Sequence, residues 1–133
     1  MDAALQAIPD ANLAIVSIPG EHAREVVLKL LDKELCVHLF SDHVPAEHEL
    51  ELKQYAREKG LLVMGPGAGT SIIGGKAVAF ANVVKKGKVG LVAAAGTGLQ
   101  EVSVLLSEAG LGVSEALGVG GGDVKTRIGG LMT

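Results

Sequence analysis

The chain has 133 residues, a formal net charge of −3 and 48% hydrophobic residues, a composition that predicts a folded protein and argues against binding to DNA or RNA. A single cysteine, Cys36, excludes an intrachain disulfide and a metal site built on thiolates. No apolar run reaches the roughly 20 residues that cross a bilayer, and the N-terminus lacks the basic start of a signal peptide, so we expect a cytoplasmic protein without a membrane partner.

Five short apolar runs alternate with amphipathic segments along the chain. The apolar runs predict buried strands, and the helical spacing of apolar residues in the other segments predicts helices, two of them ending at Gly60 and Gly110. The predicted strands are residues 13–18, 35–40, 61–64, 89–94 and 113–119, and the predicted helices are residues 21–33, 45–59 and 97–109. This alternation predicts an α/β fold with a mainly parallel sheet and flanking helices.

A junction is expected in the middle of the chain. Residues 72–84 are predicted to be a less regular connection, and Lys85, Lys86 and Lys88 a solvated turn. We therefore expect one unit over residues 1–84 and a second, of about one β-α-β module, over residues 85–133. Among the four histidines, His38 is predicted to be packed within a strand, and the others to lie on the surface or in turns.

Three glycine-rich turns, residues 64–70, 95–98 and 120–123, each follow a predicted strand. Glycine lets the backbone turn sharply, and the free N–H groups at a helix start attract anions. Ligands of such sheets bind beyond the carboxyl ends of the strands. We therefore predict an anion site at Gly96, Thr97 and Gly98.

Thr97 also has a structural interpretation. With Gln100 it matches a capping box, which would make it the N-cap of the third helix, and both roles are compatible. The turns lack an intact dinucleotide fingerprint and a P-loop lysine, which disfavours a nicotinamide-binding protein.

Segments in unbroken order over nearly the whole chain resemble FdrA-type proteins, relatives of the succinyl-CoA synthetase alpha subunit. They are Pro9 to Ala14, Glu58 to Pro66, Gly69 to Ser71, Ala79 to Val83, Gly96 to Glu101, and Gly120, Gly121 and Asp123. The resemblance implies a Rossmann-like CoA-binding domain over residues 1–84, without its first glycine-loop strand, and the start of a flavodoxin-like ligase domain over residues 85–133.

The resemblance also implies where ligands bind. CoA or a related nucleotide would be bordered by Ser17, Ile18, Pro19, Ser41, Pro45, Gly65, Pro66, Gly69 and Thr70. A phosphoryl or acyl-phosphate group would lie at Gly96, Thr97 and Gly98, with Glu101 as a candidate catalytic acid. A favourable charge near the helix start explains Glu101 about as well, and Gly120, Gly121 and Asp123 fit a structural turn.

The chain departs from the family pattern at several ligand-facing positions. Gly67 and Ala68 replace an acidic or polar residue and a cysteine, Ala95 replaces a serine, and Gly122 replaces the FdrA arginine. The histidine that such synthetases phosphorylate has no counterpart here. Each change removes a side chain while backbone amides remain, so anion binding could persist with weaker chemistry.

Two hypotheses follow from the resemblance and its departures. The first is an acyl-CoA synthetase-like subunit, a ligase or transferase for acyl, phosphoryl or carbamoyl groups, linked to oxamate carbamoyltransferase, whose other domains or partner subunits complete the enzyme in an oligomer. The second is a non-catalytic binding or assembly module that retains the fold and the anion site. In both, the expected ligand is an anionic small molecule such as phosphate, CoA or carbamoyl phosphate, and no metal is expected.

Overall fold

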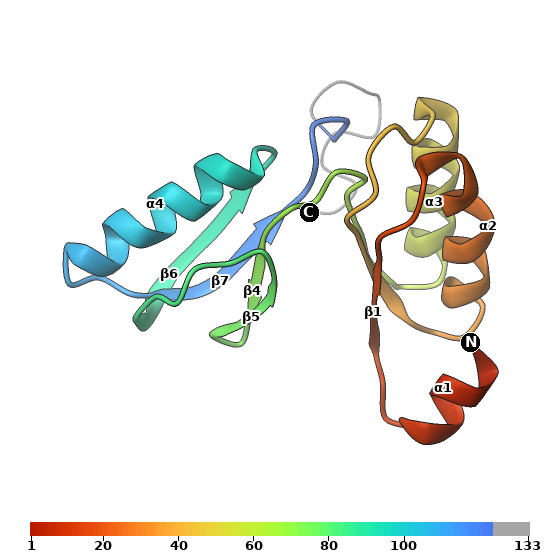
Figure 1. Cartoon of the computed structure of the whole chain (residues 1–133), viewed down its shortest axis with the longest axis horizontal. Helices are drawn as coiled ribbons and strands as arrows, with labels where there is room; N and C mark the ends of the chain where they lie inside the picture. Colours follow the sequence, from red (N-terminus) through yellow and green to blue (C-terminus); the bar gives the residue numbers. More distant parts are fainter. Residues whose placement is uncertain (124–133) are drawn as a thin grey trace.

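The computed structural model describes residues 1–123, the part of the chain to which the following refers. Helices and strands alternate along most of it (Figure 1). The elements are α1 (Asp2–Ala7), β1 (Leu13–Val16), α2 (Gly20–Leu31), β2 (Cys36–Leu39), α3 (Ala46–Glu58), β3 (Val63–Met64), β4 (Ser71–Ile73), β5 (Lys76–Ala79), β6 (Lys86–Ala93), α4 (Gly96–Glu108) and β7 (Val113–Gly118). None of these helices has the length and apolar character needed to cross a membrane.

The first sheet is fully parallel, in the order β1-β2-β3. α2 and α3 lie side by side on one of its faces, on the right in Figure 1. The core between the helices and the sheet is aliphatic, and Val27, Leu31, Leu39 and Leu52 are all 0% exposed. Burying one such side chain stabilises the folded chain by about 1.5–3 kcal/mol. The aliphatic residues that the sequence predicts on these strands and helices therefore account for the packing of this layer.

The second sheet has the order β5-β4-β7-β6. β6 and β7 are parallel and joined through α4, whereas β4 is antiparallel to both of its neighbours. Leu99, Val113 and Ala116 form the core beneath α4. The mainly parallel α/β fold with flanking helices is thus confirmed, with one antiparallel hairpin added to it.

That hairpin corrects the expected irregular connection over residues 72–84. β4 and β5 form two strands of the second sheet, and Ile72 of β4 lies opposite Ala116 of β7. The pairing partner is more than 40 residues away, so no local pattern indicates it. The division after residue 84 stays a prediction, and residues 124–133 of the expected second unit lie outside the described residues.

The ends of the elements match the sequence in part. Gly60 and Gly110 end α3 and α4 with φ of 69° and 80°, as glycine at a helix end allows. The capping box was wrong, because the N-cap of α4 is Ala95 and Gln100 donates its hydrogen bond to Thr70 instead. The lysine turn was also wrong, because β6 begins at Lys86.

His38 connects the two sheets from within the core, and its prediction as a packed strand residue is confirmed. It is 0% exposed in β2, and its Nδ1 lies 3.2 Å from Oγ of Ser71 in β4. Burial lowers the pKa of His38, with a smaller opposing effect from the backbone of Ala68. The folded protein therefore disfavours the charged imidazole.

We expect this histidine to make stability depend on pH. Because the pKa of His38 is lower in the folded than in the unfolded chain, its contribution is full above the ordinary histidine range and decreases as the pH falls toward the folded pKa. The slope for one proton is at most about 1.4 kcal/mol per pH unit. Urea unfolding between pH 8 and 5 should show a shallower acid loss in His38→Gln than in the wild type. The exposed control His22→Gln should keep the wild-type slope, and equal slopes in all three proteins would contradict the prediction.

Candidate functional site

The three glycine turns meet where the two sheets join. A Cβ added to Gly96 would lie only 3.4 Å from the Cα of Gly69, so the first and second turns touch through their backbones. In the third turn, a Cβ on Gly120, whose φ is 78°, would overlap the carbonyl oxygen of Pro66. Glycine is required at Gly120 by both its φ and this close approach.

A cavity of about 330 Å³ lies beyond the carboxyl ends of β1 and β2, and we call it the polar cavity because it is more polar than the one that adjoins it. It brings together four of the residues predicted to border CoA, namely Ser17, Ile18, Ser41 and Gly69, although they come from three separate loops. The other lining residues are Phe40, Asp42 and Gly67. This is the edge of a parallel sheet where ligands of such folds bind.

Hydrogen bonds between the loops hold the walls of this cavity in place. The backbone N–H of Ile18 donates to Oγ of Ser41 at 3.0 Å, and the N–H of Gly67 donates to the carbonyl oxygen of Ser41 at 2.8 Å. Ser41 is only 5% exposed, so its hydroxyl serves mainly to fix the loop after β1. The cavity is therefore preformed.

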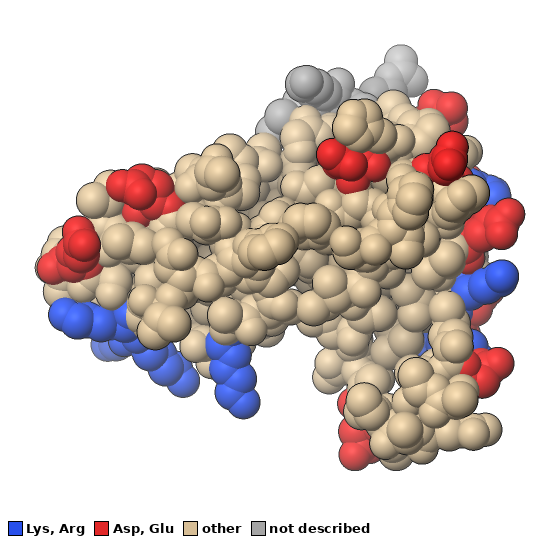
Figure 2. Space-filling view, viewed as in Figure 1, with Lys and Arg blue, Asp and Glu red and all other residues tan. Residues whose placement is uncertain are grey.

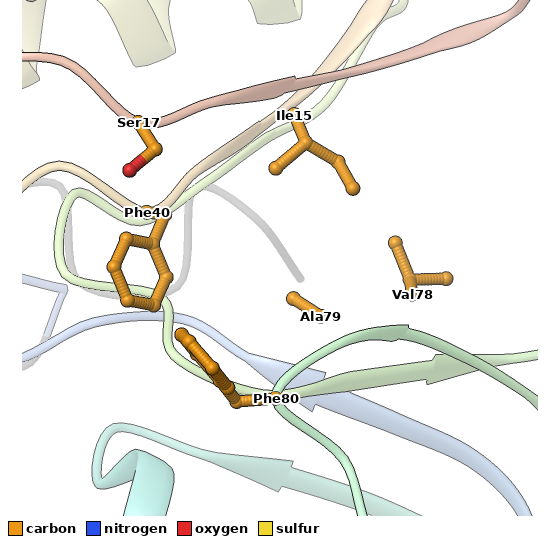
Figure 3. Close-up of a pocket in the computed structure, with 6 residues that line it drawn as sticks. All are labelled: Ile15, Ser17, Phe40, Val78, Ala79 and Phe80. Atoms are coloured by element: carbon orange, nitrogen blue, oxygen red, sulfur yellow. The ribbon is translucent and has the colours of Figure 1, made fainter.

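An apolar cavity of about 380 Å³ adjoins the polar one and shares Ser17 and Phe40 with it. Figure 3 shows Phe40 and Phe80 approaching each other from opposite sheets, with Ile15 and Val78 on the two walls. The two ring centroids are 5.2 Å apart and the rings are tilted by 52°. The sequence analysis missed this part of the site, and its only signal was that both phenylalanines of the chain lie here.

The remaining predicted CoA residues do not line either cavity. Pro19 and Pro45 are the N-cap residues of α2 and α3, next to the lining loops. Gly65 and Pro66 are buried, and a Cβ on Gly65 would overlap the carbonyl oxygen of Leu39. A ligand contact for these residues stays a prediction.

Thr70 joins the two sheets rather than facing the cavities. It is 1% exposed, and its Oγ1 lies 2.9 Å from the carbonyl oxygen of Phe80 and 3.2 Å from that of Gly96. The same oxygen accepts a hydrogen bond of 2.9 Å from Nε2 of Gln100. One buried hydroxyl thus connects the first glycine turn, the end of β5 and the start of α4.

The start of α4 is accessible. Thr97 and Gly98 are exposed and Gly96 is half-buried. The first N–H groups of a helix have no partner within it and lie at the positive end of its dipole. Glu101 is exposed, about one turn further along α4. The anion site and the catalytic role of Glu101 stay predictions.

Within residues 1–123, one group of lysine side chains lies away from the start of α4. It gathers at the far end of the second sheet, over the start of β6 and the β4-β5 hairpin, at the lower left of Figure 2. In the third turn, Gly121 is exposed whereas Gly120 and Asp123 are buried. Within residues 1–123, no three His, Cys, Asp or Glu side chains come together as a metal site.

Comparisons with known proteins give two kinds of relatives. The protein YahF of Escherichia coli K12 is 52% identical over 125 residues, which are 94% of this chain and 24% of YahF. The alpha subunit of the ADP-forming succinate-CoA ligase of Methanothermobacter thermautotrophicus is 29% identical over 86% of this chain and 40% of that subunit. No protein-family model matches the chain.

Among solved structures, the ATP citrate lyase of Methanothrix soehngenii, in complex with citrate and coenzyme A, superposes with a TM-score of 0.82. It is 21% identical and covers 91% of this chain and 22% of its own, so it supports the fold alone. The chain thus spans about a quarter to two fifths of the relatives it matches. The expected resemblance to succinyl-CoA synthetase alpha subunits is confirmed, and the narrower FdrA assignment stays a prediction.

The junction at Thr70 can be tested by removing one oxygen. Thr70→Val keeps the shape of the side chain but leaves Nε2 of Gln100 and the carbonyl group of Phe80 without this partner, so we expect a loss of about 1–3 kcal/mol in the free energy of unfolding. Thr70→Ser retains the hydroxyl and should lose clearly less. Urea unfolding of both variants decides the matter, and equal losses would assign the effect to packing.

Proposed function

We propose that this chain, a member of the succinyl-CoA synthetase alpha-like superfamily, forms the CoA-binding cleft and the anion-binding helix start of a larger acyl-CoA ligase-like enzyme. The observation that carries the proposal is the cavity in which Ser17, Ile18, Ser41 and Gly69 meet beyond the ends of β1 and β2. The relatives are several times longer than this segment, so further domains or partner subunits would complete the enzyme in the cytoplasm.

The shapes of the two cavities suit the parts of CoA or a related nucleotide. In the polar cavity, backbone groups, the hydroxyl of Ser17 and the carboxylate of Asp42 offer hydrogen bonds to ribose or amide groups. The adjoining apolar cavity offers the rings of Phe40 and Phe80 to an apolar part of the ligand. A phosphoryl group would lie at the start of α4, where Gly96, Thr97 and Gly98 present backbone N–H groups.

The finer proposal concerns the group that is transferred. Following the FdrA-type resemblance, it is a carbamoyl group, with carbamoyl phosphate as the anion at the start of α4 and oxamate as a linked substrate. Helix N–H groups would stabilise the negative charge that develops on the phosphate, and Glu101 would act as a general acid or base.

A non-catalytic module is the second candidate, favoured by one feature of the site. Around the start of α4 the accessible positions Gly69, Ala95 and Gly98 present only backbone and methyl groups. Such a surface can bind an anion but offers few side chains for proton transfer. In this case the protein would bind CoA or phosphate without turning either over.

CoA binding is tested at Ser17, an exposed residue that lines both cavities. A phenyl ring in Ser17→Phe would fill the space while leaving the core untouched. We expect calorimetry on the full-length protein to show CoA binding that weakens at least about tenfold in this variant, equivalent to 1.4 kcal/mol. Gln54→Phe, at an exposed position of α3, is the control and should bind as the wild type. Equal affinity in both variants would place CoA elsewhere.

The catalytic role of Glu101 is tested by kinetics on the full-length protein. Carbamoyl transfer from carbamoyl phosphate to oxamate, and acyl-CoA formation from succinate, ATP and CoA, should be assayed side by side. In the active assay we expect Glu101→Gln to lower kcat at least about 100-fold without loss of stability, because Glu101 is exposed. Glu108→Gln, exposed at the other end of α4, is the matched control. CoA binding without turnover in either assay would favour the non-catalytic module.

A further inference from the structure

Lys53 lies in the interior of the protein between two carboxylates. Its Nζ is 2.8 Å from Oε1 of Glu49, one turn earlier on α3, and 2.8 Å from Oδ1 of Asp123 in the third glycine turn. The three side chains are 2%, 5% and 7% exposed. One charged group therefore connects two positions that are 70 residues apart in the sequence.

The third glycine turn is fitted closely around this cluster. A Cβ added to Gly122 would overlap the carboxylate of Glu49, so a larger side chain there would require this carboxylate to move. On its other side the turn meets the first glycine turn through the contact of Gly120 with Pro66. Just before the turn, the N–H of Gly118 at the end of β7 donates a hydrogen bond of 2.9 Å to the carbonyl oxygen of Thr70. The third turn thus lies between the cluster of Glu49, Lys53 and Asp123 and the loop of residues 65–70, which we call the cavity loop.

A movement of the third glycine turn would reach the cavity wall through the cavity loop. Gly67 and Gly69 line the proposed CoA cavity, and they lie in the same loop as Pro66 and Thr70. If the third turn moves away from Pro66, this loop loses the packing contact that Gly120 makes with it. The cavity wall therefore depends on a contact made outside the cavity.

A buried ion cluster is an inefficient way to gain stability. Removing charges from water costs several kcal/mol per ion, and apolar residues of the same volume are often equally or more stabilising. In some proteins, buried polar groups instead select one arrangement among several. The geometry at Lys53 fits this second role, because the ammonium group binds Asp123 in the third turn and Glu49 on α3 at the same time.

We propose that Lys53 is a positioning residue that sets the place of the third glycine turn and, through Pro66 and Thr70, the shape of the CoA cavity. The proposal deepens the function proposed above, since it assigns the cavity a determinant on α3. The ligand class is that of the cavity, CoA or a related nucleotide.

The test replaces the cluster by neutral groups of similar shape, in the triple variant Glu49→Gln, Lys53→Met, Asp123→Asn of the full-length protein. CoA affinity by calorimetry and hydrogen exchange at the Gly118 and Val119 amides are measured together. We expect CoA affinity to fall about tenfold and both amides, bonded to the oxygens of Thr70 and Ala93, to exchange faster, while thermal unfolding stays cooperative. The control removes the partly exposed Arg24-Glu51 pair between α2 and α3, by Arg24→Gln and Glu51→Gln, and should change neither readout.

A folded triple variant with wild-type affinity and wild-type exchange would overturn the proposal. If the triple variant does not fold, Asp123→Asn alone, which keeps an oxygen acceptor at that position, gives the same two readouts. If the wild type does not bind CoA, the proposed function fails, and the exchange rates of the two amides still decide whether Lys53 positions the turn. Recovery of both readouts in Lys53→Arg, relative to Lys53→Met, would further support a charge-dependent role.

Discussion

The structure depends on the close approach of backbones at one loop, residues 65–70. The loop follows β3 in the first sheet and leads into β4 in the second, and both neighbouring glycine turns press against it. The N–H of Ala68 bonds to Leu39, the hydroxyl of Thr70 reaches Phe80 and Gly96, and Pro66 contacts Gly120. A Cβ on Gly65 or Gly120 would overlap a backbone oxygen, so glycine at these two positions is first a requirement of packing. Gly67, which has open space around it, lines the cavity instead.

Two of the residues that line the candidate cavity, Gly67 and Gly69, contribute main-chain groups alone. A cavity fixed by hydrogen bonds between loops can hold a flexible ligand in one orientation. In the proposed function, this chain would supply binding and orientation, and further domains or subunits would supply the reactive groups. The aromatic pair Phe40 and Phe80 adds the one large apolar surface near the cavity, and it does so by combining one ring from each sheet.

Local sequence patterns were sufficient to predict most of the strands and helices. The alternation of apolar runs and amphipathic segments predicted the strands β1, β2, β3, β6 and β7 and the helices α2, α3 and α4, and the glycines that end α3 and α4 were found from their position. The β4-β5 hairpin was missed because it is stabilised by pairing with β7, and the capping box failed because Gln100 binds a buried threonine from another loop in place of the helix end.

In the site, Ser17, Ile18, Ser41 and Gly69 were predicted by resemblance to a family, whereas Phe80 and the Lys53 cluster depend on contacts across long separations that no spacing reveals.

The bond between Lys53 and Asp123 also has a consequence for the order of assembly. The first sheet, α2 and α3 involve residues 13–64 alone, so they can collapse before the rest of the chain has emerged from the ribosome. The ammonium group of Lys53 has only Glu49 as a carboxylate partner at that stage, because Asp123 is synthesised 70 residues later. Closing so long a loop is entropically slower than forming neighbouring contacts. If Lys53 positions the third turn as proposed, the cavity would reach its final shape late in biosynthesis, when the turn after β7 docks onto a core that is already folded.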